Sequence, residues 1–281
     1  MLEHTPDVDY LVIGHVARDL TPDGPVLGGT VSYAGLTAAA LGLRVGVLTA
    51  AAADQDLSAL DGLHVERLDS PDTTTFENIY ADGARRQVLH ARARRLGPGD
   101  VPPRWRTPRI VHLGPIADEV DPELVAAFPA ALVGLTPQGW MRAWDADGRV
   151  HDAPWTSAAR LLPAAGAVVL SLDDVGGDEH RIDDMAGQCR LLVVTEGPRG
   201  ARVYWNRDLR RLPAPAVEEV DPTGCGDIFA AAFFVRLYQT RDPWEAARFA
   251  NALAAAGVTR RGLEGAPTAA DLAAASQQVI P

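Results

Sequence analysis

The sequence contains no lysine, so arginine carries all of its permanent positive charge. A phosphate loop of the Gly-x-x-x-x-Gly-Lys type requires a lysine, and that class of nucleotide site is therefore excluded. Acidic residues also outnumber basic ones, 37 to 26, which gives the chain a formal net charge of −11. Such a chain lacks the basic surface that nucleic acids bind, so we expect no nucleic-acid partner.

Cysteines and long apolar segments are equally scarce. The two cysteines, Cys189 and Cys225, are too few for a disulfide framework, and neither lies in a metal-ligand spacing. No apolar run reaches the length of a membrane span, and no charged-then-apolar leader opens the chain. We therefore expect no membrane partner and a reducing, cytoplasmic location.

Short apolar runs, typical of buried strands, alternate with alanine-rich helical segments along the chain. This alternation predicts an α/β fold with a doubly wound, mostly parallel sheet flanked by helices, formed by residues 1–281 as a single domain. Two segments, at about 20–28 and 72–92, interrupt the rhythm. Asp82-Gly83 marks a hairpin turn in the second. We predict that these two segments form a small β lid, which would exclude water from a site beneath it.

The strongest chemical signal lies at residues 221–227, which read Asp-Pro-Thr-Gly-Cys-Gly-Asp and precede an apolar, helical run. Backbone N–H groups at a helix start are unpaired and lie in the positive field of the helix dipole, which favours anions. We predict that the N–H groups of Gly224, Cys225 and Gly226 cradle a transferred phosphoryl group. Asp227 would accept the proton of the attacking hydroxyl. The alternative is a glycine-rich loop that caps an ordinary buried helix.

This segment resembles the Asp-Thr-x-Gly-Ala-Gly-Asp signature of the ribokinase-like carbohydrate kinases, the PfkB family. Pro222 stands where Thr is usual and Cys225 where Ala is usual, and both are small enough to leave the backbone role intact. The resemblance extends from Gly14 to Asn251 and implies a ribokinase-like fold whose lid closes over the substrate. It also implies transfer of a phosphoryl group from ATP, with Mg²⁺, to a hydroxyl of a sugar, a polyol such as inositol, or a nucleoside.

At the acceptor end, the resemblance assigns Asp19, Gly28, Gly29 and Tyr33 to substrate binding. Asp19 follows a glycine and four residues, as does the family's substrate-binding Asp, and a carboxylate accepts two hydroxyl hydrogen bonds. Gly28 and Gly29 resemble the family's Gly-Gly signature, which allows a sugar to approach the backbone. Tyr33 departs from the family's usual Asn. Without the resemblance, Asp19 would be a solvated loop residue and the glycines a turn before a helix capped by Thr30.

Residues 136–142 fall where many family members carry Asp-x-Asn-x-Arg, although the match is poor. Gln138 and Arg142 are candidates to face the substrate, and the alternative is that Trp140 only packs the edge of the lid. None of the histidines has a zinc spacing, and we interpret His15 as a local hydrogen-bonding residue.

At the donor end, Thr195, Gly197 and Gly200 match the family's Thr-x-Gly-x-x-Gly loop, which lines the nucleotide phosphates. Asn251 matches an Asn on a helix that flanks the adenine. The resemblance therefore assigns these four residues to ATP. Taken alone, the first three would form only a tight turn, and a mid-helix Asn would be exposed.

Metal binding is implied at two places. Asp174 stands where the family commonly has a Glu that organises Mg²⁺ through water, and Ser171 stands where Asn is common; Mg²⁺ tolerates such changes because it keeps several waters. The alternative is an acidic loop that caps a helix. Asp221 and the carbonyl of Thr223, completed by residues 260–264, resemble part of a monovalent-cation site, which would take K⁺.

Two other functions remain open. A pyridoxal or hydroxymethylpyrimidine kinase shares the fold, but the predicted lid favours the sugar branch. A catalytically degenerate sensor of a sugar or nucleotide is favoured by the departures at Ser171, Asp174 and Tyr33, and disfavoured by the intact Asp227. A homodimer in which two lids join their sheets is a further expectation.

Overall fold

The computed structural model describes residues 7–81 and 84–277, so the predicted turn at Asp82-Gly83 lies outside the described residues. The central sheet contains β1 (Tyr10–Ile13), β4 (Val45–Ala51), β5 (His64–Asp69), β8 (Ile110–Leu113), β9 (Leu132–Leu135), β12 (Ala167–Ser171), β13 (Leu191–Thr195), β14 (Ala201–Trp205) and β15 (Asp208–Leu212). Their order is β15-β14-β13-β12-β9-β8-β1-β4-β5. The pairs are parallel except β13–β14 and β14–β15. The predicted, mostly parallel α/β fold is confirmed.

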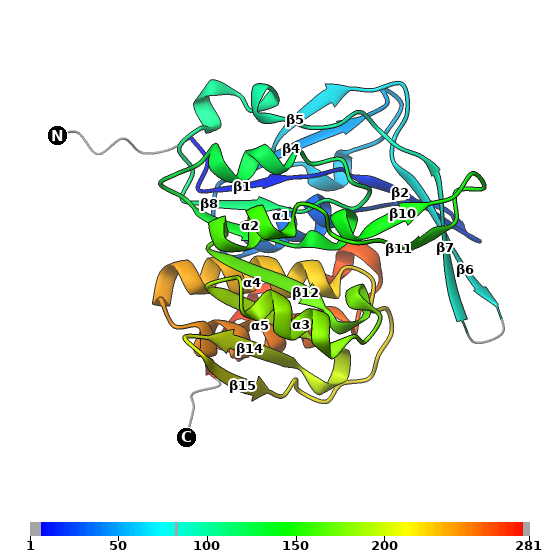
Figure 1. The fold of residues 1–281 in the computed structure, drawn as a ribbon. Coiled ribbons are helices and arrows are strands. Elements are labelled where there is room, and N and C mark those ends of the chain that lie inside the picture. Colours follow the sequence, from blue (N-terminus) through cyan, green and yellow to red (C-terminus); the bar gives the residue numbers. More distant parts are fainter. Residues whose placement is uncertain (1–6, 82–83, 278–281) are drawn as a thin grey trace.

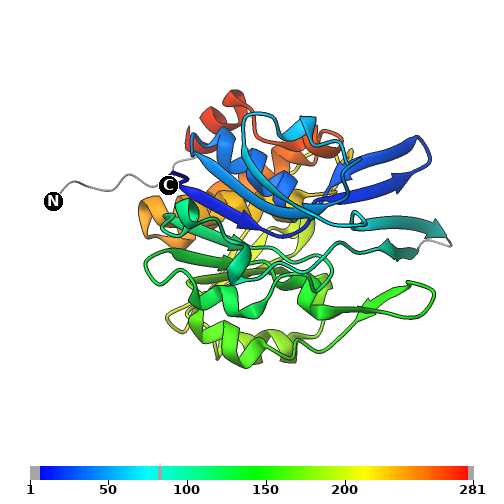
Figure 2. The ribbon, with the colours of Figure 1, turned by 90° about the horizontal axis from the view of Figure 1, so that it is seen from above.

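Helices cover both faces of this sheet (Figure 2). One face carries α1 (Thr30–Ala40), α4 (Cys225–Thr240), α5 (Pro243–Gly257) and α6 (Ala269–Gln277), and the other carries α2 (Ala158–Ala164) and α3 (Glu179–Ala186). Alternate strand residues enter the two cores: Val12 packs toward α4, whereas Leu11 packs toward α2 and α3. Because both faces are covered, the strands read as continuous apolar runs. Within the described residues, no helix has the length and apolar character of a membrane span.

A separate four-stranded sheet projects beyond the central sheet (Figure 1). It contains β2 (Ala17–Thr21), β3 (Gly24–Gly28), β6 (Thr75–Ala81) and β7 (Ala84–Ala91), in the order β3-β2-β6-β7. These strands come from the two segments that interrupt the α/β rhythm. Because β2 begins at Ala17, Asp19 lies in a strand rather than in a loop.

Several elements have no counterpart in the sequence prediction: β5, α2, α3, and the two-stranded hairpin of β10 (Arg142–Trp144) and β11 (Val150–Asp152). Residues Pro122–Ala126 form a 3₁₀ turn. These elements are short, and α2 contains Pro163. A segment of three to eight residues shows too few repeats for its period to be recognised.

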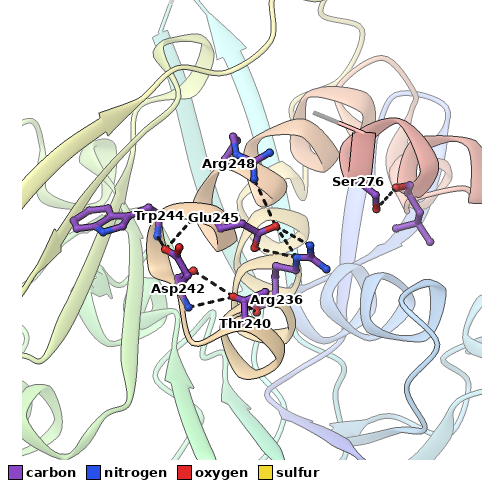
Figure 3. Close-up of polar contacts among 8 residues, drawn as sticks. Arg236, Thr240, Asp242, Trp244, Glu245, Arg248 and Ser276 are labelled. Atoms are coloured by element: carbon purple, nitrogen blue, oxygen red, sulfur yellow. Dashed lines mark hydrogen bonds and ion pairs between the residues drawn. The ribbon is translucent and has the colours of Figure 1, made fainter. Parts of the chain in front are cut away.

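Helices α4 and α5 are joined by ion pairs at the end of α4 that lies away from Cys225 (Figure 3). Glu245 on α5 accepts a hydrogen bond from Arg236 Nε on α4 at 2.9 Å, and Arg248 Nη2 lies 3.6 Å from the same carboxylate. The Arg236 guanidinium also lies 5.0 Å from the Phe249 ring centroid. This arrangement fixes the axis of α4, whose opposite end starts at the predicted phosphoryl site.

Candidate active site

A cavity of about 830 Å³ lies at the carboxyl ends of β9, β12 and β13, between the first turns of α1 and α4 and the four-stranded sheet. The carboxyl edge of an open α/β sheet is the usual place for a ligand. All of the predicted site residues line this cavity except Gly28 and Asp221. The structure thus brings together residues from both ends of the chain, and their individual roles stay predictions.

Two helices begin at the cavity without a side-chain cap. Gly29 precedes α1 with φ 88°, and Gly224 precedes α4 with φ 77°. In these first turns the Cys225 N–H donates to the Pro222 carbonyl at 3.2 Å and the Ser32 N–H to the Gly29 carbonyl at 3.0 Å. Of the predicted cradle, the N–H groups of Gly224 and Gly226 are left for a ligand, and both helix dipoles favour negative charge there. Burial and the carboxylates of Asp221 and Asp227 raise the pKa of the Cys225 thiol to about 12. The thiol stays protonated and adds no negative charge to the predicted cradle.

Tyr33 lies directly against the start of α4. A Cβ atom on Gly224 would overlap the Tyr33 ring, so glycine is required there both for its positive φ and for this contact. Tyr33 is 3% exposed and lines the cavity, and no described residue forms a hydrogen bond with its hydroxyl. Burial and the charges of Asp19 and Asp227 raise its pKa, which keeps the hydroxyl protonated as a donor. The hydroxyl is therefore placed to donate to a ligand in the cavity.

Asp227 lies half-buried at the base of the cavity, in the first turn of α4. Burial raises its pKa to about 6, and the negative charges of Asp174 and Asp19 act in the same direction. A hydrogen bond from the Thr30 side chain and the positive charge of Arg142 act against this rise. At neutral pH the group is a carboxylate that is more basic than an ordinary Asp, which suits a proton acceptor.

The two glycines at the acceptor end are required by packing. A Cβ on Gly28 would overlap the carboxylate of Asp19, so Gly28 makes room for that side chain instead of lining the cavity. A Cβ on Gly29 would lie 2.8 Å from the Ala17 nitrogen, and its φ is 88°. The predicted approach of a sugar to the Gly28 backbone is therefore not supported, whereas Gly29 does line the cavity.

Several cavity residues were missed or only weakly indicated by the sequence. Asn78 and Gln87 are cross-strand partners in β6 and β7, and Gln87 Nε2 donates to Asn78 Oδ1 at 3.1 Å. Arg142 and Asp152 are cross-strand partners in β10 and β11. In both hairpins two polar residues lie directly opposite each other on neighbouring strands. The sequence indicates such a polar pair only when the position of the hairpin turn is known, because the turn decides which residues face each other.

At the donor end, Gly197 and Gly200 have φ values of 57° and 93°. A Cβ on Gly200 would overlap the Leu212 carbonyl, so this loop lies against the end of β15. Asn251 is 4% exposed, and its Nδ2 donates to the same carbonyl at 2.9 Å. The alternative that Asn251 is merely an exposed mid-helix residue is therefore wrong. Asn251 ties α5 to the wall of a slot that small side chains also line: Ala214, Ala216, Ala254 and Ala255.

Both oxygens of Asp174 are already engaged. Asp174 Oδ2 accepts from the Ser171 N–H at 2.8 Å, and Oδ1 accepts from Gln138 Nε2 at 2.8 Å. Ser171 and Asp174 form a capping box, which is the alternative that the sequence left open. A metal ion at this position would meet Asp174 through the remaining lone pairs or through water.

Asp221 lies outside the cavity and fastens the loop before α4. Its Oδ1 accepts from the Thr223 N–H and its Oδ2 from the Gly262 N–H, each at 2.9 Å. Asp174 lines the cavity and Asp221 does not, so the two predicted metal positions are separate places in the structure. Across residues 7–81 and 84–277, no group of three or more His, Cys, Asp or Glu side chains is arranged to hold a metal ion.

Residues 170–269 match the protein-family model described as pfkB family carbohydrate kinase. Inositol 3-kinase of Zea mays is 34% identical over 218 residues, which are 71% of this chain and 54% of that protein. Inositol 3-kinase of Oryza sativa subsp. japonica is 30% identical over 290 residues, covering 92% of this chain and 70% of that protein. The chain thus spans about half of the maize relative's length.

Among solved structures, a pyrophosphate-dependent kinase in the ribokinase family, complexed with a pyrophosphate analogue and myo-inositol, superposes with a TM-score of 0.78. The two sequences are 20% identical, and the match covers 91% of this chain and 98% of that chain. At this identity the similarity shows the fold, which is ribokinase-like.

Proposed function

Because the chain belongs to the pfkB family of carbohydrate kinases, we propose that it transfers a phosphoryl group from ATP to a hydroxyl of a polyol, with inositol as the first candidate. The observation that carries this proposal is the position of Asp227. Its carboxylate, with a pKa raised to about 6, lies in the cavity where the uncapped first turns of α1 and α4 meet. A base and an anion site in one cavity are what phosphoryl transfer to a hydroxyl requires.

The acceptor end offers both kinds of hydrogen-bonding group that a ring of hydroxyls needs. Asp19 accepts hydrogen bonds, Arg142 and the Tyr33 hydroxyl donate, and the amides of Asn78 and Gln87 do both. Asp19, Asn78 and Gln87 belong to the four-stranded sheet. We propose that this sheet, which the segments at about 20–28 and 72–92 form, acts as the lid over the acceptor and excludes water as a competing acceptor.

In the proposed reaction, Asp227 takes the proton from the acceptor hydroxyl as its oxygen attacks the terminal phosphorus of the donor. The bond between that phosphorus and the leaving oxygen breaks, and a nucleoside diphosphate leaves. The N–H groups of Gly224 and Gly226 stabilise the charge on the transferred group, as does the Arg142 guanidinium. The protein contributes position and charge, which dominate catalysis in this chemistry.

The donor end favours a nucleotide accompanied by a divalent cation. Acidic side chains prevail along the cavity, and Arg142 is the one basic residue among the described residues that line it. Polyphosphate would be repelled unless cations screen it, and Asp174 would hold Mg²⁺ through water. Mg²⁺ supplies neutralisation of the phosphate charge. The slot bounded by Asn251 and its small neighbours offers room for a nucleoside, which pyrophosphate alone would leave empty.

The proposal is tested by measuring donor consumption with ATP or pyrophosphate against inositols, pentoses, hexoses, nucleosides and vitamin precursors. We expect turnover with ATP and at least one polyol, and its loss when EDTA removes Mg²⁺. Turnover with a vitamin precursor alone would favour the vitamin kinases. Binding of a sugar or nucleotide without any turnover would favour a sensor.

Three further expectations stay predictions: a homodimer through the four-stranded sheet, activation by K⁺ and a cytoplasmic location. The two oxygens of Asp221 hold Thr223 and Gly262 together, and this is the segment where the K⁺ site is proposed. Comparing rates in Na⁺ and K⁺ tests it directly, and unchanged rates would argue that Asp221 only fastens the loop.

The pH dependence of the reaction should report the pKa of Asp227. We expect kcat/KM to fall as pH drops below about 6, because protonation removes the base. Arg142→Gln should move this midpoint to higher pH, since the Arg142 charge lowers the pKa of Asp227. A rate profile of both proteins checks this. A midpoint near pH 4, or a downward movement in Arg142→Gln, would contradict the assignment of Asp227 as the base.

A further inference from the structure

The hairpin of β10 and β11 has its base at the cavity. Arg142 and Asp152 form the first cross-strand pair and both line the cavity. Just outside this pair, the Ala153 N–H donates to the Met141 carbonyl at 2.8 Å. Arg142 is close enough to Asp227 for its charge to lower the pKa of that group. The base of the hairpin therefore helps to set the electrostatics of the proposed base.

The tip of the same hairpin is bound to the four-stranded sheet. The Leu89 N–H of β7 donates to the Gly148 carbonyl at 2.8 Å, and Val88 forms a bridge with Arg149. Gly148 has φ 76°, and a Cβ there would overlap the Leu89 carbonyl oxygen. The turn is held by Asp145 Oδ1, which accepts from the N–H groups of residues 147 and 149 at 2.9 Å each. The tip is thus a fitted contact and not a free loop.

The middle of the hairpin packs against a buried cluster at the base of the four-stranded sheet. Trp144 and Val150, a cross-strand pair, contact a small buried cluster that draws one residue from each of three strands: Ala17, Phe76 and Leu89. The Arg92 guanidinium lies 5.1 Å from the Trp144 ring centroid. In Figure 1 the hairpin extends to the four-stranded sheet, and it meets β7 near its tip. Two strands of three residues, attached at base, middle and tip, leave little freedom for the sheet to move alone.

We propose that the β10–β11 hairpin is a strap that transmits the position of the four-stranded sheet to Arg142, with Trp144 and Gly148 as its positioning residues. An acceptor bound by the sheet would, through the strap, hold Arg142 in its place beside Asp227. Binding of the acceptor and the ionised state of the base would then be coupled. The kinetic consequences of this inference rest on the proposed function. The effect of the strap on the position of Arg142 does not.

Arg142 acts on Asp227 together with other charged and titratable groups, which any test must hold constant. They come from every element packed around the base: Tyr10 of β1, Asp19 of β2, Tyr33 of α1, Asp174 after β12, and Cys225 of α4. None of these belongs to the hairpin. A substitution at the hairpin tip reaches Asp227 either through Arg142 or through Asp19 of the four-stranded sheet. The two routes have opposite signs, because moving Arg142 away raises the pKa of Asp227 whereas moving Asp19 away lowers it.

The first variant is Gly148→Ala, whose Cβ overlaps the Leu89 carbonyl and separates the tip from β7. Its matched control is Gly62→Ala, which carries the same kind of backbone strain, with φ 96°, but meets no atom within 4 Å. For Gly148→Ala we expect about a 10-fold rise in the acceptor KM with an unchanged donor KM, roughly the loss of one hydrogen-bond contact. Gly62→Ala should match the wild type in both. Equal behaviour of the two variants overturns the proposal.

A double-mutant cycle distinguishes a strap from mere structural support. If the hairpin acts through Arg142, the kinetic effect of Gly148→Ala should largely disappear in an Arg142→Gln background. Independent, multiplying effects would overturn the proposal. Should Gly148→Ala fail to fold, Trp144→Leu in both backgrounds takes its place.

A readout without substrate separates this inference from the proposed function. The pKa of Asp227 is obtained from the pH dependence of the free energy of unfolding, by comparing each protein with its Asp227→Asn form. In Gly148→Ala, and in Trp144→Leu, we expect this pKa to lie above its wild-type value, because Arg142 has moved away. An unchanged pKa overturns the strap even if the protein proves to be a kinase. A raised pKa supports it even if no acceptor is found.

Discussion

Asp227→Asn is expected to lower kcat by about 10³-fold while leaving the fold intact, since asparagine keeps the shape of the side chain but does not accept the proton. The KM values for acceptor and donor should change little, because the hydroxyl and phosphate contacts come from other residues. Steady-state kinetics with the acceptor found in the substrate screen checks this. The control is Asp183→Asn, which removes an exposed carboxylate of α3 away from the cavity. A turnover of Asp227→Asn near that of the control would remove Asp227 from the mechanism.

The same substitution should make the protein more stable in neutral solution. The folded pKa of Asp227, about 6, exceeds that of an unfolded Asp, about 4, so the folded state loses stability as pH rises through this interval. Asparagine has no such loss. We expect the free energy of unfolding to be higher in Asp227→Asn by on the order of 1–3 kcal/mol above about pH 7, and equal below about pH 4. Urea unfolding at both pH values measures this, and a less stable variant at the higher pH would contradict the raised pKa.

The second large effect is expected for Gly224→Ala. An alanine there would hold a positive φ of 77° and place its Cβ into the Tyr33 ring. Strain and overpacking together should lower the free energy of unfolding by about 2–5 kcal/mol and abolish phosphoryl transfer, because the first turn of α4 would shift. Urea unfolding and turnover of the same preparation are the measurements.

Gly226→Ala is the matched comparison in the same loop. Its Cβ would meet no atom within 4 Å, so the free energy of unfolding should stay within about 0.5 kcal/mol of the wild type. The new methyl group would nevertheless project where the phosphate is expected, and the donor KM should rise. Equal stability of the two variants would contradict the Tyr33 contact. Full activity of Gly226→Ala would argue against a close approach of phosphate to this backbone.

The fold class could be predicted because its signals are local. A buried parallel strand needs an uninterrupted apolar run, as at residues 191–195, wherever it lies in the sheet. The segment 221–227 likewise carries its meaning in order and spacing, since an uncapped helix start with glycines depends only on neighbouring residues. The short hairpin of β10 and β11 has no comparable local signal, because three-residue strands gain their stability from Phe76, Leu89 and other distant partners.

Some site residues could likewise be named from the sequence, whereas the surroundings of others could not. Asp19, Tyr33 and Asp227 were named from sequence and line one cavity. Gly28 and Asp174 were named for a ligand, yet Gly28 makes room for Asp19, and the Asp174 carboxylate is engaged by Ser171 and Gln138. A motif identifies the residue type but not the partner that reaches it from elsewhere in the chain.

The amino-acid sequence by itself determined the alternating strands and helices, the glycine-rich start of α4 and the carboxylate that follows it, because each depends on residues a few positions apart. Only the tertiary structure decided which groups surround that carboxylate: Thr30 from α1, Arg142 from a hairpin tied to β7, Asp19 from β2 of the four-stranded sheet, and Asp174 from the turn after β12 of the central sheet. Burial and charge at a distance set the pKa of Asp227, and neither quantity exists until segments that are remote in sequence have packed together.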